Sequence, residues 1–303
     1  MMSAQTLLVV GIAFAGVFGL IIGSFLNVVA YRVPAGISLM RRSQCPACDA
    51  PVRPWQNVPV LSWLALRGRC ARCGEPIPVR YPLLELGTGA LFALVTWWWT
   101  VAAHPAAAAP AFALPASLAD GWLSITTADS WTAPPAGLGS GLLAGLWFAA
   151  TGLVLTVIDL STRRLPRSIV RTALVAVTAL LALSCLLGTD WWALVRAVLG
   201  MLLLYLFYAV LWLAKPGGMG GGDVRLAALI GLLLGWFGWW PLLVGGFAAF
   251  VLGGVYGICL ILFGRATRRT AVPFGPWMIA GAALGAVFGT AIGNGYLSLF
   301  GMA

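Results

Sequence analysis

Charged residues are scarce in this sequence. They make up 9% of the 303 residues, whereas soluble domains carry about 25%. Only eight side chains are acidic, against 18 basic ones, and a single lysine and a single histidine occur. A chain this poor in charge cannot cover a water-exposed surface. The composition therefore excludes a soluble enzyme, a coiled coil and a disordered chain, and it indicates an integral membrane protein in a lipid bilayer.

The sequence also lacks a basic segment before its first apolar run, since no charge precedes Arg32. The run from Leu7 to Ala30 is too long for the core of a signal peptide, so we interpret it as a retained first span. We expect an all-α polytopic membrane protein with about eight transmembrane helices. The seven later apolar runs begin near Pro82, Gly141, Ser168, Trp191, Val224, Pro241 and Trp277.

These runs predict three parts. Residues 1–30 form the first transmembrane helix, residues 31–81 a cytoplasmic Cys-rich loop, and residues 82–303 a seven-helix membrane domain. An outer loop over 104–140 interrupts the membrane domain and is rich in Ala, Pro and Ser. No stripe of basic residues with interleaved aromatics occurs, so the net charge of +10 gives no sign of nucleic-acid binding.

The basic residues predict the orientation in the membrane. Between Arg32 and Arg80 eight arginines face only two acids, and bases recur at every second connection after that loop. Residues 101–140 contain two acids and no base. Because basic loops stay in the cytoplasm, both termini should face outward. Only Arg196, near the outer end of the fifth span, breaks this pattern.

The long basic loop carries two C-x-x-C pairs, Cys45-Pro-Ala-Cys48 and Cys70-Ala-Arg-Cys73, with 21 residues between them. Two such knuckles can place four thiolates tetrahedrally around Zn²⁺, and a cytoplasmic location disfavours disulfides. Metal binding would also give a small loop without a large core a reason to fold. We expect a zinc-ribbon-like structural site. The alternative is two redox-active or merely unpaired thiol pairs.

Two of the eight acids lie at the predicted cytoplasmic membrane edge. Asp159 ends the third apolar run, and Asp223 follows a glycine-rich segment and opens the sixth span. Ionisable groups at membrane depth are costly and are therefore functional candidates. Simpler roles stay open at this point, because Asp223 could be a helix N-cap and Asp159 could pair with Arg163 and Arg164.

If the two carboxylates meet, their chemistry is specific. Like charges a few ångströms apart cannot both ionise easily, so the pair would hold one proton. One carboxylate could then act as base on a water molecule while the other polarises a scissile carbonyl. Consecutive glycines would let the backbone approach an extended peptide. Nothing in the sequence shows that two residues 64 positions apart are neighbours.

The order and spacing of several short motifs resemble the prepilin (type IV leader) peptidases, membrane aspartic proteases of the GxGD type. The resemblance covers most of the chain. It rests on Gly23–Arg32, both Cys pairs, Asn57–Ser62, Leu66–Gly68, Arg80–Glu85, Asp159 with Leu165-Pro166, Gly218–Asp223 and Pro273–Pro276. Two positions depart from the usual pattern, where Arg225 replaces Lys and Arg167 replaces an acidic or amidic residue.

The resemblance implies that Asp159 and Asp223 are the catalytic pair and that Gly220 and Gly222 belong to the supporting GxGD loop. It implies cleavage of the leader of prepilins or pseudopilins after a Gly, at the cytoplasmic face. It leaves open a second activity, methylation of the new N-terminus with S-adenosylmethionine, because many members with the four-cysteine loop have it. The resemblance assigns no residues to that cofactor, and we expect its site in the segment Gly23–Arg32 and the cysteine loop up to Glu85.

Three other classes of protein fit these features less well. An ion-coupled transporter would use broken, glycine-rich helices, but it would place its acids at the midplane and would often show an inverted repeat. A zinc-ribbon membrane scaffold would leave the two aspartates unexplained. A thiol oxidoreductase would need its C-x-x-C pairs on an oxidising face, against the charge bias.

Overall fold

The computed structural model describes residues 4–103, 138–188, 191–215, 219–264 and 273–300. Within these residues the chain is helical, and the only β-structure is two isolated bridges in the cysteine loop. The all-α prediction is confirmed. The long helices are α1 (Ala4–Arg32), α3 (Arg80–Ala103), α6 (Leu138–Thr162), α7 (Arg167–Gly188), α8 (Trp191–Ala214), α9 (Gly221–Phe237), α10 (Trp239–Leu262) and α11 (Gly275–Leu299).

Six of the long helices, all except α3 and α9, are long and apolar enough to cross a membrane. The predicted total of eight spans is therefore supported for six of them. Helix α9 has only 17 residues, which at 1.5 Å per residue is about 25 Å, less than the ~30 Å hydrocarbon core. Its surroundings explain how it is accommodated, because every residue from Leu226 to Phe237 is buried by neighbouring helices.

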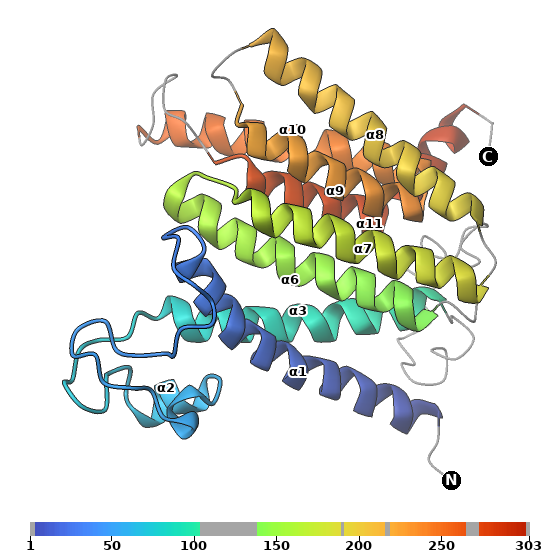
Figure 1. The fold of residues 1–303 in the computed structure, drawn as a ribbon. Coiled ribbons are helices and arrows are strands. Elements are labelled where there is room, and N and C mark those ends of the chain that lie inside the picture. The colour runs from blue at the N-terminus through green and yellow to red at the C-terminus, as the bar shows by residue number, and fades with distance from the viewer. Residues whose placement is uncertain (1–3, 104–137, 189–190, 216–218, 265–272, 301–303) are drawn as a thin grey trace.

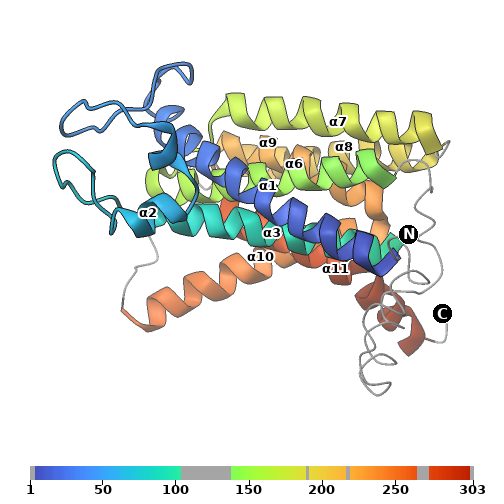
Figure 2. The same cartoon turned by 90° about the horizontal axis from the view of Figure 1, so that it is seen from below.

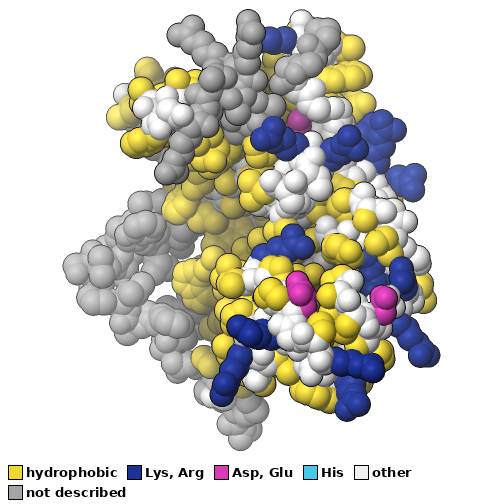
Figure 3. Space-filling model, turned by 90° about the vertical axis from the view of Figure 1, so that its left-hand side faces the viewer, with side chains coloured by type: hydrophobic (Ala, Val, Ile, Leu, Met, Phe, Trp, Pro, Cys, Tyr) yellow, Lys and Arg dark blue, Asp and Glu magenta, His cyan; other side chains and the backbone are white. Residues whose placement is uncertain are grey.

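The bundle has two distinct ends (Figures 1 and 2). The cysteine loop, which holds η1 (Pro54–Asn57) and α2 (Leu61–Ala65), projects from one end in both views. The turn from α6 to α7 and the first turns of α9 and α11 lie at this same end, while the first turn of α1 lies at the other. Figure 3 looks onto the loop end and shows many Lys and Arg side chains but few acids. The basic connections therefore share one end of the bundle.

The observed helix bounds lie close to the predicted division of the chain. Helix α1 continues to residue 32, and α3 begins at residue 80. The division at 1–30, 31–81 and 82–303 stays a prediction. Most of the predicted outer loop, residues 104–137, lies outside the described residues.

Close backbone contacts hold α9 in the middle of the bundle. Helices α8 and α9 cross where Gly200 faces Gly231 and Gly235, and a Cβ atom on Gly200 would lie 2.6 Å from the Gly231 carbonyl oxygen. Small residues at such crossings let two membrane helices approach until their backbones touch. A larger side chain at Gly200 would push α9 away from α8.

Arg196 has a structural role that its place in the sequence did not suggest. From α8 its guanidinium reaches the end of α9, where Nε donates to Gly235 O and Nη2 to Trp236 O, both at 2.8 Å. The last carbonyls of a helix lack partners within the helix and carry partial negative charge. Arg196 satisfies two of them, which accounts for a base near the predicted outer end of the bundle.

We predict that Arg196→Leu lowers the free energy of unfolding by about 2–4 kcal/mol, because two hydrogen bonds to a charged donor are lost and both carbonyls stay buried. Thermal melting of the purified protein in detergent measures the change. Arg171→Leu is the matched control, since Arg171 is exposed on α7. Equal melting temperatures for the two variants would contradict the capping role.

Candidate active site

Asp159 lies in the last turn of α6 and is 5% exposed. Its Oδ2 accepts a hydrogen bond of 3.0 Å from the backbone N–H of Gly275, the first residue of α11. A Cβ atom on Gly275 would lie 2.8 Å from this same oxygen, so only glycine permits the contact. The Pro273–Pro276 motif of the sequence thus brings the start of α11 against Asp159.

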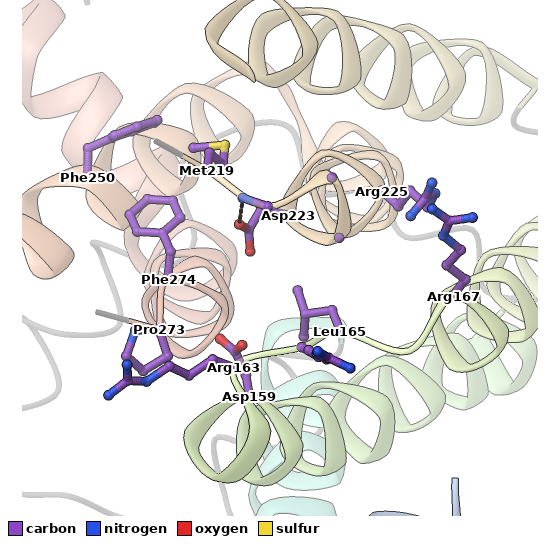
Figure 4. Close-up of a pocket in the computed structure, with 14 residues that line it drawn as sticks. Asp159, Arg163, Leu165, Arg167, Met219, Asp223, Arg225, Phe250, Pro273 and Phe274 are labelled. Atoms are coloured by element: carbon purple, nitrogen blue, oxygen red, sulfur yellow. Dashed lines mark hydrogen bonds between the residues drawn. The ribbon is translucent and has the colours of Figure 1, made fainter. Parts of the chain in front are cut away.

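Asp223 is the third residue of α9 and is 8% exposed. Its Oδ2 accepts a hydrogen bond of 3.0 Å from the N–H of Gly220, and its own N–H donates to Gly220 O at 3.0 Å. Asp223 is thus the third helical residue and bonds back to Gly220, the N-cap, so the alternative that Asp223 is itself the N-cap is wrong. Capping engages one carboxylate oxygen, and Figure 4 shows the carboxyl group directed into a pocket.

The glycines before Asp223 differ in how tightly they are packed. A Cβ atom on Gly222 would lie 2.8 Å from Leu165 Cβ, in the connection between α6 and α7. One on Gly220 would lie 3.3 Å from the Asp223 carboxylate, whereas Gly221 has open space around it. Gly222 therefore lets the start of α9 approach Leu165, and Gly220 lets the loop close over Asp223.

Both aspartates line one pocket of about 760 Å³, at the end of the bundle that carries the basic loops. The pocket brings together α6 and α9, whose aspartates are 64 residues apart in sequence, and the charge of Asp159 acts on Asp223. The wall of the pocket consists of Asp159, Arg163, Arg164, Leu165, Arg167, Met219, Gly220, Gly221, Gly222, Asp223, Arg225, Phe250, Pro273 and Phe274.

Four arginines line this pocket, but they do not neutralise the aspartates directly. Within the described part of the chain, neither Arg163 nor Arg164 forms an ion pair with Asp159, whose side chain bonds only to Gly275 N–H. The structure thus gives no support to a salt bridge at Asp159. Arg163 instead takes a left-handed conformation (φ 52°) just beyond α6, and its N–H donates to Asp159 O at 2.8 Å.

An apolar wall faces the carboxylates. Phe274 packs against Phe250, with ring centroids 5.4 Å apart, and Met219 lies beside them in Figure 4. Phe274 and Met219 both lie within motifs of the resemblance, Pro273–Pro276 and Gly218–Asp223. No sequence signal marked Phe250, because an aromatic residue within an apolar span looks like any other lipid-facing or core residue.

The four loop cysteines also meet. All four Sγ atoms lie within 4.8 Å of one another, and those of Cys45 and Cys73 are 3.8 Å apart. Four thiolates at ~2.3 Å from one Zn²⁺ in a tetrahedron would have their sulfurs about 3.8 Å apart. The cluster is therefore suited to hold a metal ion.

The two knuckles share one backbone conformation, which explains the spacing of the cysteines. Asp49 N–H donates to Cys45 O at 2.9 Å, and Gly74 N–H donates to Cys70 O at 3.0 Å. Asp49 (φ 53°) and Gly74 (φ 74°) both take left-handed conformations. The N–H groups of Cys73 and Arg72 lower the pKa of the Cys70 thiol to about 6, whereas burial and the neighbouring thiols raise the pKa of Cys73 to about 12.

Comparisons with known proteins agree with this arrangement. Residues 17–99 match the bacterial peptidase A24 N-terminal domain, and residues 146–258 match the type IV leader peptidase family. The first match includes both knuckles, and the second includes both aspartates. No solved structure matches the chain.

Several curated relatives are named prepilin leader peptidase/N-methyltransferase. One from Burkholderia pseudomallei is 35% identical, with 92% of this chain and 86% of the relative covered. One from Pseudomonas putida is 32% identical, with 96% and 95% covered, and one from Bacillus subtilis is 30% identical, with 93% and 96% covered. With two family models covering both halves of the fold, the chain belongs to the type IV leader peptidase family.

Proposed function

We propose that this chain is a multi-pass inner-membrane aspartic peptidase that cleaves the leader of type IV prepilins or pseudopilins after a Gly. The observation that carries this proposal is the pair of buried aspartates, delivered by α6 and α9 to one pocket at the basic end of the bundle. Family membership and the relatives' names support the same activity. The basic connections at that end support placing the pocket at the cytoplasmic face.

In the proposed mechanism, Asp159 and Asp223 share one proton and hold a water molecule between them. The ionised carboxylate takes a proton from the water as its oxygen attacks the scissile carbonyl carbon, while the protonated carboxyl group donates a hydrogen bond to the carbonyl oxygen. The carbonyl then re-forms as the C–N bond breaks, and the leaving amine takes one of the two protons now on the pair, which returns the pair to its singly protonated state. The shared proton belongs to the pair and is not assigned to either residue.

The position of the pocket suits a membrane-embedded substrate. It lies where α6 ends and α9 begins, at the level of the connecting loops. An extended leader junction can reach this edge while the apolar helix of the pilin stays in lipid. An ion-coupled transporter would need its acids near the middle of the helices, and these two lie at helix ends.

We further propose that the cysteine cluster holds a structural Zn²⁺ ion and that the chain methylates the new N-terminus with S-adenosylmethionine. The sulfur spacing supports the metal, which would fix the cysteine loop by joining its two knuckles. The relatives' names support the second activity.

We predict that Asp159→Asn and Asp223→Asn each lower cleavage of a prepilin by about 10³-fold or more, because neither variant can share a proton across the pair. Asp129→Asn, which makes the same change in the predicted outer loop, should cleave like wild type. Mass spectrometry of the product N-terminus gives the cleavage site. A folded Asn variant that keeps wild-type rates would rule out the two-aspartate mechanism.

A second prediction concerns the glycines of the loop. Gly222→Ala should lower the cleavage rate by about 10–100-fold, because its methyl group collides with Leu165 and displaces Asp223. Gly221→Ala is the neighbouring control, and we expect less than about a threefold loss because its Cβ meets open space. Single-turnover cleavage rates measure both, and similar losses in the two variants would contradict this account.

For the metal, we predict about one zinc ion per purified chain, bound by the four thiolates. Cys45→Ser should lose most of this zinc and lower the melting temperature, whereas Cys259→Ser, a change outside the cluster, should keep it. Elemental analysis by mass spectrometry measures the zinc content. Folded, metal-free wild-type protein with four freely reactive loop thiols would overturn the zinc assignment.

A further inference from the structure

The cysteine loop encloses a second pocket, separate from the one that contains the aspartates. It has a volume of about 240 Å³ and lies between the knuckles, the short helix α2 and the first turns of α3. Cys45 and Cys70, which belong to the thiol cluster, form part of its wall. Metal binding at the cluster would therefore also fix the shape of this pocket.

The charge lining this pocket is opposite to that of the surrounding loop. Residues 31–81 contain eight arginines and only two acids. Yet the side chains that line the pocket include Glu75 and Glu85, and no Lys or Arg is among them. The aspartate pocket, by contrast, is lined by four arginines. A pocket whose only charged side chains are acids, within such a basic loop, suits a positively charged ligand.

Glu85 is the most deeply placed of these acids, at 8% exposure on the second turn of α3. Its Oε2 accepts a hydrogen bond of 2.7 Å from the N–H of Val60, whose backbone is held at φ 60°. In the described part of the chain, no cationic side chain forms an ion pair with Glu85. A buried carboxylate without a counter-ion is costly, and a cationic ligand would provide the missing charge.

The remaining wall offers a fixed aromatic surface. Trp63 donates from Nε1 to Ile77 O at 3.0 Å, and its ring covers Gly68, where a Cβ atom would come within 2.8 Å. Tyr81 also lines the pocket. Aromatic rings attract cations and stack on flat heterocycles. Gln56, Asn57 and Ser62 add amide and hydroxyl groups that can bind a polar ligand.

We propose that this pocket binds S-adenosylmethionine, with the Glu85 carboxylate facing its sulfonium group. The inference rests on the proposed N-methyltransferase activity and gives it a location. The two acids of the wall can match the sulfonium and the ammonium of this ligand. The amide and hydroxyl groups can bind its carboxylate, and the aromatic surface can stack on its adenine ring.

The reaction that this site would serve is balanced without any other co-reactant. The sulfonium S–CH₃ bond breaks and its electron pair stays on sulfur, which leaves a neutral thioether. The lone pair of a neutral N-terminal amine forms the new N–CH₃ bond, and the methylated ammonium loses one proton to water. Glu85 acts on binding, since its charge favours the sulfonium over the thioether product.

The test compares three ligands on the full-length, zinc-containing protein in detergent by isothermal titration. S-adenosylmethionine and its unreactive amine analogue sinefungin carry a positive charge at the sulfonium position. The third ligand, S-adenosylhomocysteine, has a neutral sulfur at that position. Glu85→Gln removes the charge but keeps an oxygen that can accept the Val60 N–H. Asp129→Asn makes the same kind of change in the predicted outer loop, away from the cysteine loop in the sequence.

We expect Glu85→Gln to weaken binding of both charged ligands by about tenfold or more and to change binding of S-adenosylhomocysteine much less. Asp129→Asn should leave all three affinities unchanged. Equal losses for charged and neutral ligands, or no loss, would overturn the assignment. Should Glu85→Gln fail to fold, Trp63→Leu provides the second variant, and unchanged affinity for all three ligands would also overturn it.

Assays of prepilin cleavage and of methylation on the same wild-type preparation distinguish a failure of this inference from a failure of the proposed function. A wild type that neither cleaves nor methylates contradicts the proposed function itself. A wild type that cleaves but binds none of the ligands contradicts the methyl-donor site and leaves the peptidase assignment intact. If the wild type methylates but Glu85→Gln binds S-adenosylmethionine as tightly as the wild type does, the methyl donor binds elsewhere.

Discussion

The burial of α9 is the constraint on which the rest of the structure depends. A helix enclosed by protein in a membrane has few water molecules to bond its terminal backbone groups, so most of these groups must find partners within the chain. At the start of α9, Asp223 accepts from Gly220 N–H; at the end, Arg196 donates to two carbonyls. The carboxylate that the proposed chemistry needs is thus also part of what completes the helix.

This dual role explains why the loop before α9 is rich in glycine. One oxygen of Asp223 is held by the backbone, which fixes the carboxyl group without a neighbouring cation. Asp159 is fixed in the same way, by the N–H of Gly275. In both cases a glycine lets the backbone approach the carboxylate, so each acid is positioned by a neutral donor and the negative charge of the pair stays available in the pocket. An arginine paired with either acid would have neutralised that charge.

Much of this arrangement could be predicted, for reasons that differ between residues. Asp159 and Asp223 stood out because acids are rare in apolar helices, and the Cys pairs because their spacing suits a metal. Their meeting across 64 residues followed only from the family resemblance. Arg196 was seen as an exception to a charge rule, because its acceptors are backbone carbonyls 39 and 40 residues away that no side-chain pattern reveals. Glu85 entered only as the last residue of the Arg80–Glu85 motif and the limit of the expected cofactor site, because its contact with Val60 N–H depends on a left-handed residue that is not glycine.

The two pockets differ in charge, and this difference suggests a direction for the proposed reactions. Both lie at the same end of the bundle, one lined by arginines around two aspartates and the other by two glutamates without a base. Cleavage would create a new N-terminal amine, which is positive when protonated. The arginines of the first pocket would disfavour its staying there, while the acids of the second would attract it towards the methyl donor. Methylation requires the neutral amine, so the proton must leave before transfer. The charge contrast would therefore promote release of the cleaved product from one pocket and its arrival at the other.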